Sequence, residues 1–122
     1  MTDFLRTDIF VSNSLFEAEF ARQFRQQPIR FPMFGFDPKV HSVRLPVSTI
    51  EEIGLTGATD RGRYHGGIGL LRVRIGDRDA LCACDGPAAS DVPIVGRIVL
   101  HQLFLEVDET GTLHFEPVVY RI

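Results

Sequence analysis

Asp37 is the ionisable residue with the most unusual surroundings in this sequence. It ends an aromatic-rich run, Ile29 to Phe36, and is followed by Pro38 and Lys39. A carboxylate at the end of a buried strand can act as a general acid or base, and two such groups about 3 Å apart can share one proton and activate a water molecule. A cation within about 4 to 6 Å lowers the pKa of a carboxylate. Lys39, the only lysine of the chain, would therefore oppose proton sharing at Asp37.

Cys82 and Cys84 are the only cysteines, and they lie two residues apart in a segment typical of a strand. Alternate residues of a strand share a face at a separation of roughly 6.5 to 7 Å, which is at the limit for a disulfide. A metal ion could recruit them together with His65 or His101, yet the chain has no second cysteine pair and no His-x-x-x-His spacing. We therefore expect two buried free thiols, no metal site and no cofactor.

The composition is that of an ordinary globular protein. The chain has 122 residues, of which 44% are hydrophobic and 24% charged, so we expect one domain spanning residues 1–122. A net charge of -3 with scattered arginines gives no electrostatic basis for binding nucleic acid. No apolar run reaches the ~18 residues needed to cross a bilayer, and the segment after Met1 lacks the basic start of a signal peptide. We therefore expect a cytoplasmic protein that binds neither nucleic acid nor a membrane.

Hydrophobic patterning in the first half of the chain predicts short strands and one or two helices. Residues 15–26 are ambiguous, because phenylalanines recur every four residues behind a capping-box pattern, Ser14-x-x-Glu17, while residues 16–20 also alternate as in a strand. We expect a helix there, with a strand as the alternative. The other expected elements are strands at Asp8 to Val11, ended by Ser12 and Asn13, at Ile29 to Phe36, with Pro32 as an irregularity, and at Val40 to Leu45, then a helix that Ser48-x-x-Glu51 caps and Gly54 ends.

The second half begins with polar, glycine-rich residues 55–67, which predict a loop or a mobile hairpin. Leu71, Val73 and Ile75 alternate with arginines, which predicts a strand with one buried face, and Gly76-Asp77 predicts a tight turn after it. The remaining expected elements are a strand at Asp79 to Cys84 ended by Gly86-Pro87, a strand at Val92 to Val95, a single-turn helix at Ile98 to Gln102, and strands at Leu103 to Val107 and Leu113 to Tyr120 around a turn in which Gly111 takes the positive φ. The predicted class is mainly β.

Several of these segments, in this order, resemble retropepsin-like (clan AA) aspartic peptidases. The resemblance is carried by Pro93-Ile94-Val95-Gly96-Arg97-Ile98-Val99-Leu100 and by the hairpin from Leu103 to Leu113. Upstream, Arg44-Leu45-Pro46 to Gly54-Leu55 is similar to the segment that follows the active-site loop of the family, and counting back nine residues from Pro46 reaches Asp37. The resemblance is strongest over residues 29–116. It departs from the family at the Asp-Thr-Gly motif, which is Asp37-Pro38-Lys39 here.

The resemblance implies a small closed acid-protease (retropepsin-like) barrel with one or two short helices and an extra N-terminal helix. It also implies a homodimer in which Asp37 of each chain faces its mate across a twofold axis, closed by chain termini such as residues 118–122. Pro38 has neither the hydroxyl of the family's Thr nor an N–H group, and Lys39 replaces the Gly that lets backbone amides support the carboxylates. The residues expected to bind a peptide segment in the cleft, or to form a flap over it, are Phe34, Phe36, Lys39, Val43, Tyr64, His65, Gly66 and Ile98.

Three functions are compatible with this interpretation. The first is a catalytically impaired homologue that binds an extended peptide segment by strand addition without cleaving it. The alternative is an active homodimeric aspartic endopeptidase that uses Asp37 from each chain. The third is a purely structural dimer, whose cleft would be filled by Phe34 or Phe36.

Overall fold

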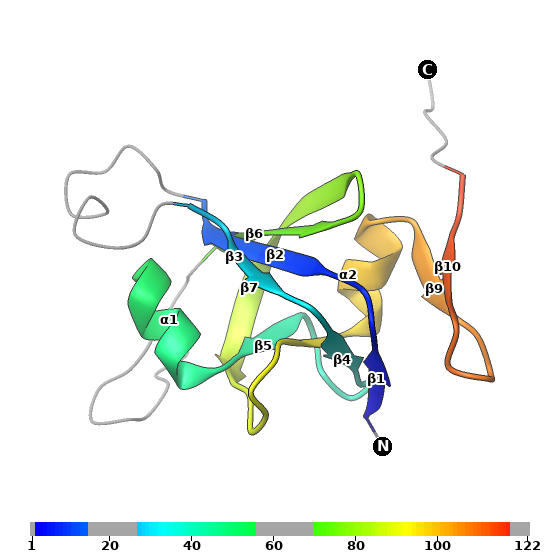
Figure 1. Ribbon diagram of the computed structural model, residues 1–122, viewed down its shortest axis with the longest axis horizontal. Helices are drawn as coiled ribbons and strands as arrows, with labels where there is room; N and C mark the ends of the chain where they lie inside the picture. The colour runs from blue at the N-terminus through cyan, green and yellow to red at the C-terminus, as the bar shows by residue number, and fades with distance from the viewer. Residues whose placement is uncertain (1, 15–26, 56–69, 118–122) are drawn as a thin grey trace.

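The computed structural model describes residues 2–14, 27–55 and 70–117 (Figure 1). Of these residues 46% lie in strands and 14% in helices, which confirms the mainly β class. The helix predicted at residues 15–26, the flap residues Tyr64, His65 and Gly66, and the chain end at residues 118–122 lie outside the described residues. The elements are β1 (Asp3–Leu5), β2 (Ile9–Asn13), β3 (Ile29–Phe31), β4 (Phe34–Phe36), β5 (Val43–Leu45), α1 (Val47–Ile53), β6 (Leu70–Ile75), β7 (Arg78–Pro87), β8 (Ile94–Val95), α2 (Arg97–Gln102), β9 (Leu105–Val107) and β10 (Leu113–Phe115).

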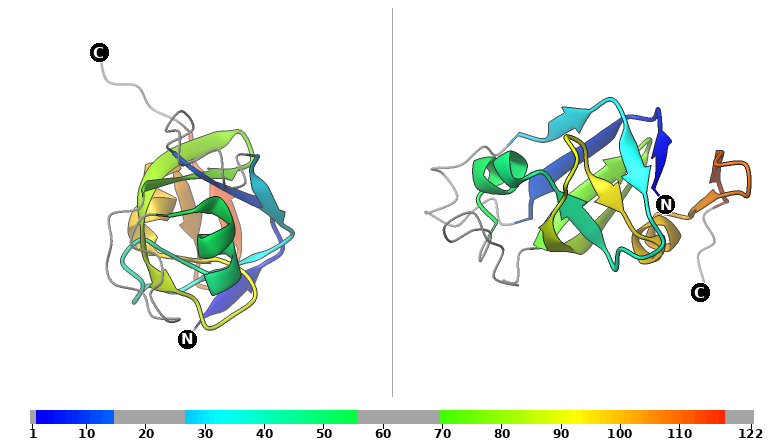
Figure 2. Two further views of the ribbon diagram at one scale, coloured as in Figure 1. Left: turned by 90° about the vertical axis from the view of Figure 1, so that its left-hand side faces the viewer. Right: turned by 90° about the horizontal axis from the view of Figure 1, so that it is seen from below.

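Eight of the strands form one sheet in the order β1-β4-β8-β5-β7-β6-β2-β3. The sheet curls into a half-barrel, with α1 at one end and the separate β9–β10 hairpin at the other (Figures 1 and 2). Neighbouring strands are antiparallel except for the pairs β4–β8 and β5–β7, which are parallel. Sequentially distant segments therefore meet in the middle of the sheet, where β8 lies between β4 and β5.

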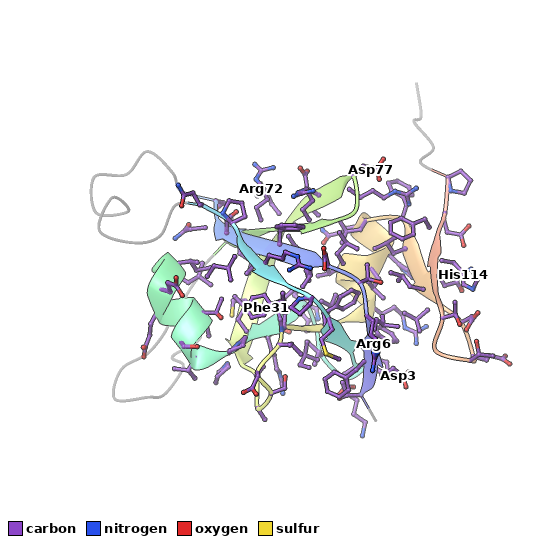
Figure 3. All side chains as sticks on the ribbon, viewed as in Figure 1. Asp3, Arg6, Phe31, Arg72, Asp77 and His114 are labelled. Atoms are coloured by element: carbon purple, nitrogen blue, oxygen red, sulfur yellow. The ribbon has the colours of Figure 1, made fainter. Side chains whose placement is uncertain are left out.

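The hydrophobic core lies inside the curl of the sheet and follows strand alternation. In β6, Leu71, Val73 and Ile75 are fully buried, while the residues between them are not, as their pattern in the sequence predicts. The hairpin of β6 and β7 is continuous from Leu70 opposite Ala83 to Ile75 opposite Arg78. Side chains fill the space between the strands, whereas the labelled Asp77 and His114 lie at the periphery (Figure 3).

The aromatic-rich run before Asp37 is two strands and not one. β3 pairs with β2 and β4 pairs with β1, and the chain breaks between them at Pro32. Proline has no N–H to donate to a sheet and its ring fixes φ, so it interrupts pairing at this point. The sequence predicted an irregularity at this residue but not the exchange of partners.

Helix α1 begins at Val47, and the predicted capping box at Ser48 and Glu51 does not form. Pro46 occupies the N-cap with no side-chain hydrogen bond, and its carbonyl oxygen accepts the N–H groups of Thr49 and Ile50. The prediction of the cap is therefore wrong, because the helix starts one residue before the Ser that was to cap it. The predicted end is correct, since Gly54 is the C-cap with a φ of 69°.

Several strand ends also differ from the predictions, among them those of β2, β7 and β5. β2 continues through Asn13, whose side-chain amide donates to the carbonyl oxygens of Ile53 and Gly54 at the end of α1. β7 continues through Gly86-Pro87, because it pairs there with β5 after its pairing with β6 has ended. The strand predicted from Val40 is shorter and begins at Val43. For β2 and β7, a partner from elsewhere in the chain decides where the strand ends, and local sequence does not reveal it. The N–H of Val40 instead donates to the carbonyl oxygen of Asp37 in a local turn before β5.

The C-terminal hairpin has the predicted turn, with Gly111 at a φ of 81°. The carboxylate of Asp108 accepts the backbone N–H groups of Thr110 and Thr112 within the turn. No helix in the described part of the chain is long and apolar enough to cross a membrane.

Candidate functional site

Asp37 directly follows β4, on the outward face of the sheet. Phe34 and Phe36 of β4 are buried, so by alternation Gly35 and Asp37 face the other way. The backbone N–H of Asp37 donates to the carbonyl oxygen of Val95 at 3.1 Å, which extends the pairing of β4 with β8 by one residue. The carboxylate is partly exposed and is held at a fixed place in the sheet.

Two donors hold the Asp37 carboxylate. Oδ1 accepts the backbone N–H of Lys39 at 2.9 Å, and Oδ2 accepts the hydroxyl of Thr2 at 3.3 Å. The Lys39 N–H, the Thr2 hydroxyl and the Lys39 ammonium all lower the pKa of Asp37 below its ordinary value, and the Lys39 N–H contributes most. Pro38 supplies neither donor, as the sequence predicts, and the carboxylate is supported instead by the N–H of the next residue and by a hydroxyl from residue 2.

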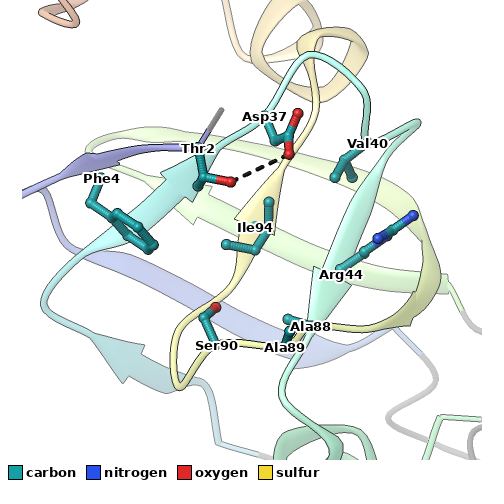
Figure 4. A pocket seen from close by; sticks show the side chains of 9 residues that line it. All are labelled: Thr2, Phe4, Asp37, Val40, Arg44, Ala88, Ala89, Ser90 and Ile94. Carbon is teal, nitrogen blue, oxygen red and sulfur yellow. Dashed lines mark hydrogen bonds between the residues drawn. The ribbon is translucent and has the colours of Figure 1, made fainter.

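A pocket of about 290 Å³ opens beside Asp37 on this outward face. Its floor is Ile94 of β8, and it is bounded by Thr2 and Phe4 on one side and by Arg44 of β5 on another (Figure 4). The described residues that line it are Thr2, Phe4, Asp37, Val40, Arg44, Ala88, Ala89, Ser90 and Ile94. The pocket therefore combines an apolar floor with one acidic and one basic side chain.

Gly35 makes room for the contacts on this face. A Cβ atom built on Gly35 would lie 2.6 Å from Cδ1 of Ile94 and 2.7 Å from Cγ2 of Thr2. The register places Phe4, Gly35, Ile94 and Arg44 in one row across four strands. Ile94 and Thr2 can approach each other over Gly35 because that residue has no side chain.

The predicted peptide-binding residues that the structure describes do not line this pocket. Phe34 and Val43 are fully buried, so strand alternation places them in the core and not in a cleft. Phe36 is buried and borders a smaller cavity of about 40 Å³ beside α2. Lys39 is exposed outside the lining, and Ile98 is 48% exposed on α2. Of the site residues predicted within the described part of the chain, only Asp37 lines the pocket.

The burial of Phe34 and Phe36 also bears on the structural-dimer hypothesis. That hypothesis expects one of the two side chains to fill the cleft beside Asp37. Neither side chain lines the pocket, and both point to the opposite side of β4. The structure therefore gives no support to a cleft filled by these residues.

Among the pocket residues that sequence analysis missed, Arg44 had a signal in the sequence. Successive residues of a strand face opposite sides, and Arg44 lies between buried Val43 and Leu45. Strict alternation of β4 and β5 would have identified Gly35, Asp37 and Arg44 as one face. Thr2 and Phe4 had no comparable signal, because β1 was not expected as a strand.

Comparison with known protein families and curated proteins adds no functional assignment to this geometry. No known family model matches the chain. No curated protein matches it either.

Cys82 and Cys84 are not joined in a disulfide and both are buried, as the sequence predicts. Burial raises the pKa of Cys82 to about 12, and it also raises the pKa of Cys84, so both are protonated at neutral pH. Within residues 2–14, 27–55 and 70–117, no group of three or more His, Cys, Asp or Glu residues is arranged to hold a metal ion. The two cysteines thus act as small core residues.

Proposed function

We propose that this chain is a retropepsin-like aspartic peptidase homologue that binds an extended peptide segment without cleaving it. The binding site is the pocket beside Asp37, and two copies of the chain form the complete cleft. The observation that carries the proposal is the position of Asp37, an ionisable side chain fixed at the border of an open pocket with an apolar floor.

The strand arrangement around Asp37 supports this proposal. β4 ends at the acid and runs parallel to β8, while β8 runs antiparallel to β5. β8 ends at Val95, and Gly96 follows as the N-cap of α2. The chain thus has an acid-bearing strand, then an apolar strand followed by glycine, and then a short helix. This order of elements is the one in which the sequence resembles the family.

The lining of the pocket supports a peptide as the ligand. Ile94, Phe4 and Val40 offer apolar contact, which an extended segment can match with a side chain on one of its faces. Ser90 and the charged residues at the border can orient a polar chain.

The electrostatics of Asp37 oppose catalysis by a shared proton. An aspartic dyad needs one protonated and one ionised carboxylate, so a low pKa of each group moves the singly protonated state to more acidic solution. The pKa of Asp37 in the single chain lies below its ordinary value, so its hydrogen bonds favour the ionised carboxylate in each chain. They therefore work against the protonated carboxylate that the reaction needs as its general acid.

We expect binding and cleavage to separate in one experiment. The parent protein and Asp37→Asn are incubated at pH 4 and pH 7 with a fluorescent library of acetylated, amidated octapeptides, and both bound and cleaved peptide are measured. We predict bound peptide with both proteins at pH 7, with affinities within about tenfold of each other because Asn keeps two polar atoms near Thr2 and Lys39. No cleavage is expected from either protein.

The outcomes distinguish the hypotheses. Cleavage by the parent at pH 4 that Asp37→Asn abolishes would establish the active endopeptidase. The absence of binding by either protein would reject the proposed function. Sedimentation equilibrium of the peptide complex tests the shared cleft, for which we predict one peptide per two chains; one peptide per monomer would contradict it.

A further inference from the structure

The pocket beside Asp37 has opposite charges on two sides of its apolar floor. Asp37 follows β4, Arg44 lies on β5, and Ile94 of β8 lies between them (Figure 4). Two strand spacings amount to about 10 Å. This separation is similar to the Debye length at physiological ionic strength, so the two charges neutralise each other only weakly. Each remains available to a ligand.

Arg44 makes no ion pair or hydrogen bond through its side chain within the described residues. Four other arginines do: Arg30 pairs with Asp8, and Arg72 pairs with Asp79. Arg74 donates to the carbonyl oxygen of Gly76, and Arg78 donates to that of Phe104. The neighbours of Arg44 in β5 are buried, which fixes its backbone and directs its side chain to the pocket face. A guanidinium fixed at its base and without a partner can bind a carboxylate through two parallel hydrogen bonds.

Among the described residues, Asp37 is the only acidic one that lines the pocket, and Thr2 and Lys39 already hold its carboxylate. It therefore does not compete for Arg44 at short range. Its negative charge would repel a second carboxylate placed beside it. An anionic group on the ligand therefore has one favourable position, at the Arg44 side of Ile94.

We propose that Arg44 makes the pocket selective for an acidic peptide segment, with the carboxylate of a Glu or Asp side chain on Arg44 and an apolar side chain on Ile94. This inference rests on the proposed function, since it names the class of peptide that the same site binds. Arg44 acts as a specificity-determining residue and takes no part in bond cleavage. The occupant is a peptide because the pocket is open and borders the free face of the sheet.

The test compares peptides that differ in one residue. The probe is the octapeptide of the library that binds the parent most tightly, made with Glu, Gln or Lys at its preferred acidic position, and measured by fluorescence anisotropy at 50 and 300 mM salt. We expect Glu to bind about 5 to 20 times more tightly than Gln at 50 mM salt, since charge-assisted hydrogen bonds exceed neutral ones while solvent weakens an exposed pair. Salt should reduce this preference.

Protein variants then assign the preference to Arg44. Arg44→Gln is expected to remove the preference for Glu over Gln, and Arg44→Glu is expected to favour Lys. The control is Arg74→Gln, which removes the same charge from an exposed strand residue outside the pocket and should keep the preference. A probe with a free C-terminus and no acidic side chain distinguishes a terminal carboxylate from a side-chain one; tighter binding of this probe than of the Glu probe would overturn the assignment to a side chain.

Failure of this inference is distinguishable from failure of the proposed function. If the octapeptides bind the parent with equal affinity for Glu, Gln and Lys, the selectivity is rejected and peptide binding stands. If Arg44→Gln keeps the full preference, another residue determines it and the inference is wrong. If no octapeptide binds at all, both proposals are rejected.

Discussion

Gly96→Ala is expected to lower the free energy of unfolding by at least about 3 kcal/mol, because the added methyl group has no room. Gly96 joins β8 to α2, and its N–H donates to the carbonyl oxygen of Ser42 at 2.7 Å. A Cβ atom on Gly96 would lie 2.1 Å from the carbonyl oxygen of Val40 and 3.0 Å from that of His41. These are backbone atoms, so no side-chain rotation can relieve the overlap. Urea denaturation measures the loss.

Gly111→Ala is the matched control for this prediction. Gly96 has a φ of -91°, which alanine adopts without strain, so its cost comes from the overlap alone. Gly111 has a φ of 81°, and a Cβ atom added to it would meet nothing within 4 Å, so its cost comes from backbone strain alone. We expect about 1 kcal/mol for Gly111→Ala. Equal costs for the two variants would contradict the close approach of Gly96 to the loop that carries Asp37.

Phe34→Ala is expected to cost about 3 to 5 kcal/mol of stability, because it leaves a large cavity in the core. The Phe34 side chain is 0% exposed and belongs to the cluster inside the curled sheet. Phe4 provides the comparison, since it is 51% exposed and lines the pocket on the outward face. We expect Phe4→Ala to change stability by less than about 1 kcal/mol and to weaken peptide binding.

The two phenylalanine variants separate the core from the site. Urea denaturation gives the stability of each variant, and anisotropy with the tightest octapeptide gives the affinity of Phe4→Ala. If Phe34→Ala kept normal stability but lost peptide binding, Phe34 would line the cleft, as the sequence suggested, and the alternation of β4 would be wrong. The opposite pattern is the one that the fold requires.

Local sequence predicts those parts of the fold in which neighbouring residues determine the structure. The β6–β7 hairpin follows from the alternation of Leu71, Val73 and Ile75 with arginines and from a tight turn at Gly76, whose φ is positive. The end of α1 at Gly54 and the turn at Gly111 follow from the freedom of glycine to adopt positive φ. Each of these depends on contacts within a few residues.

The site is harder to predict because it brings together distant segments. The hydroxyl of Thr2 donates to Asp37, 35 positions further along the chain. Gly96, which lies at the junction of β8 and α2, approaches the backbone of Val40. Neither a close backbone approach nor a hydroxyl group from another strand produces a periodic pattern in the sequence. Asp37 was predicted from the resemblance to the peptidase family and from its place after an apolar run, whereas Thr2 and Arg44 required the pairing of β1, β4, β8 and β5.

The proposed cleavage defect also depends on this long-range arrangement. The sequence suggested that Lys39 affects Asp37 mainly through its ammonium group. The structure instead assigns the largest effect on the pKa of Asp37 to the Lys39 N–H, followed by the Thr2 hydroxyl among the groups that lower it. Because a hydrogen bond from the backbone does not depend on the lysine side chain, replacing Lys39 by a neutral residue would leave the main cause of the low pKa in place.

The most direct test of the central claim is an amide NMR titration of the full chain with the tightest octapeptide. The account predicts that the largest shifts fall on the residues around the pocket, at Phe4, Asp37, Arg44, Ile94 and the turn of Ala88 to Ser90. Shifts confined to the β6–β7 hairpin, or to any other surface away from Asp37, would contradict it.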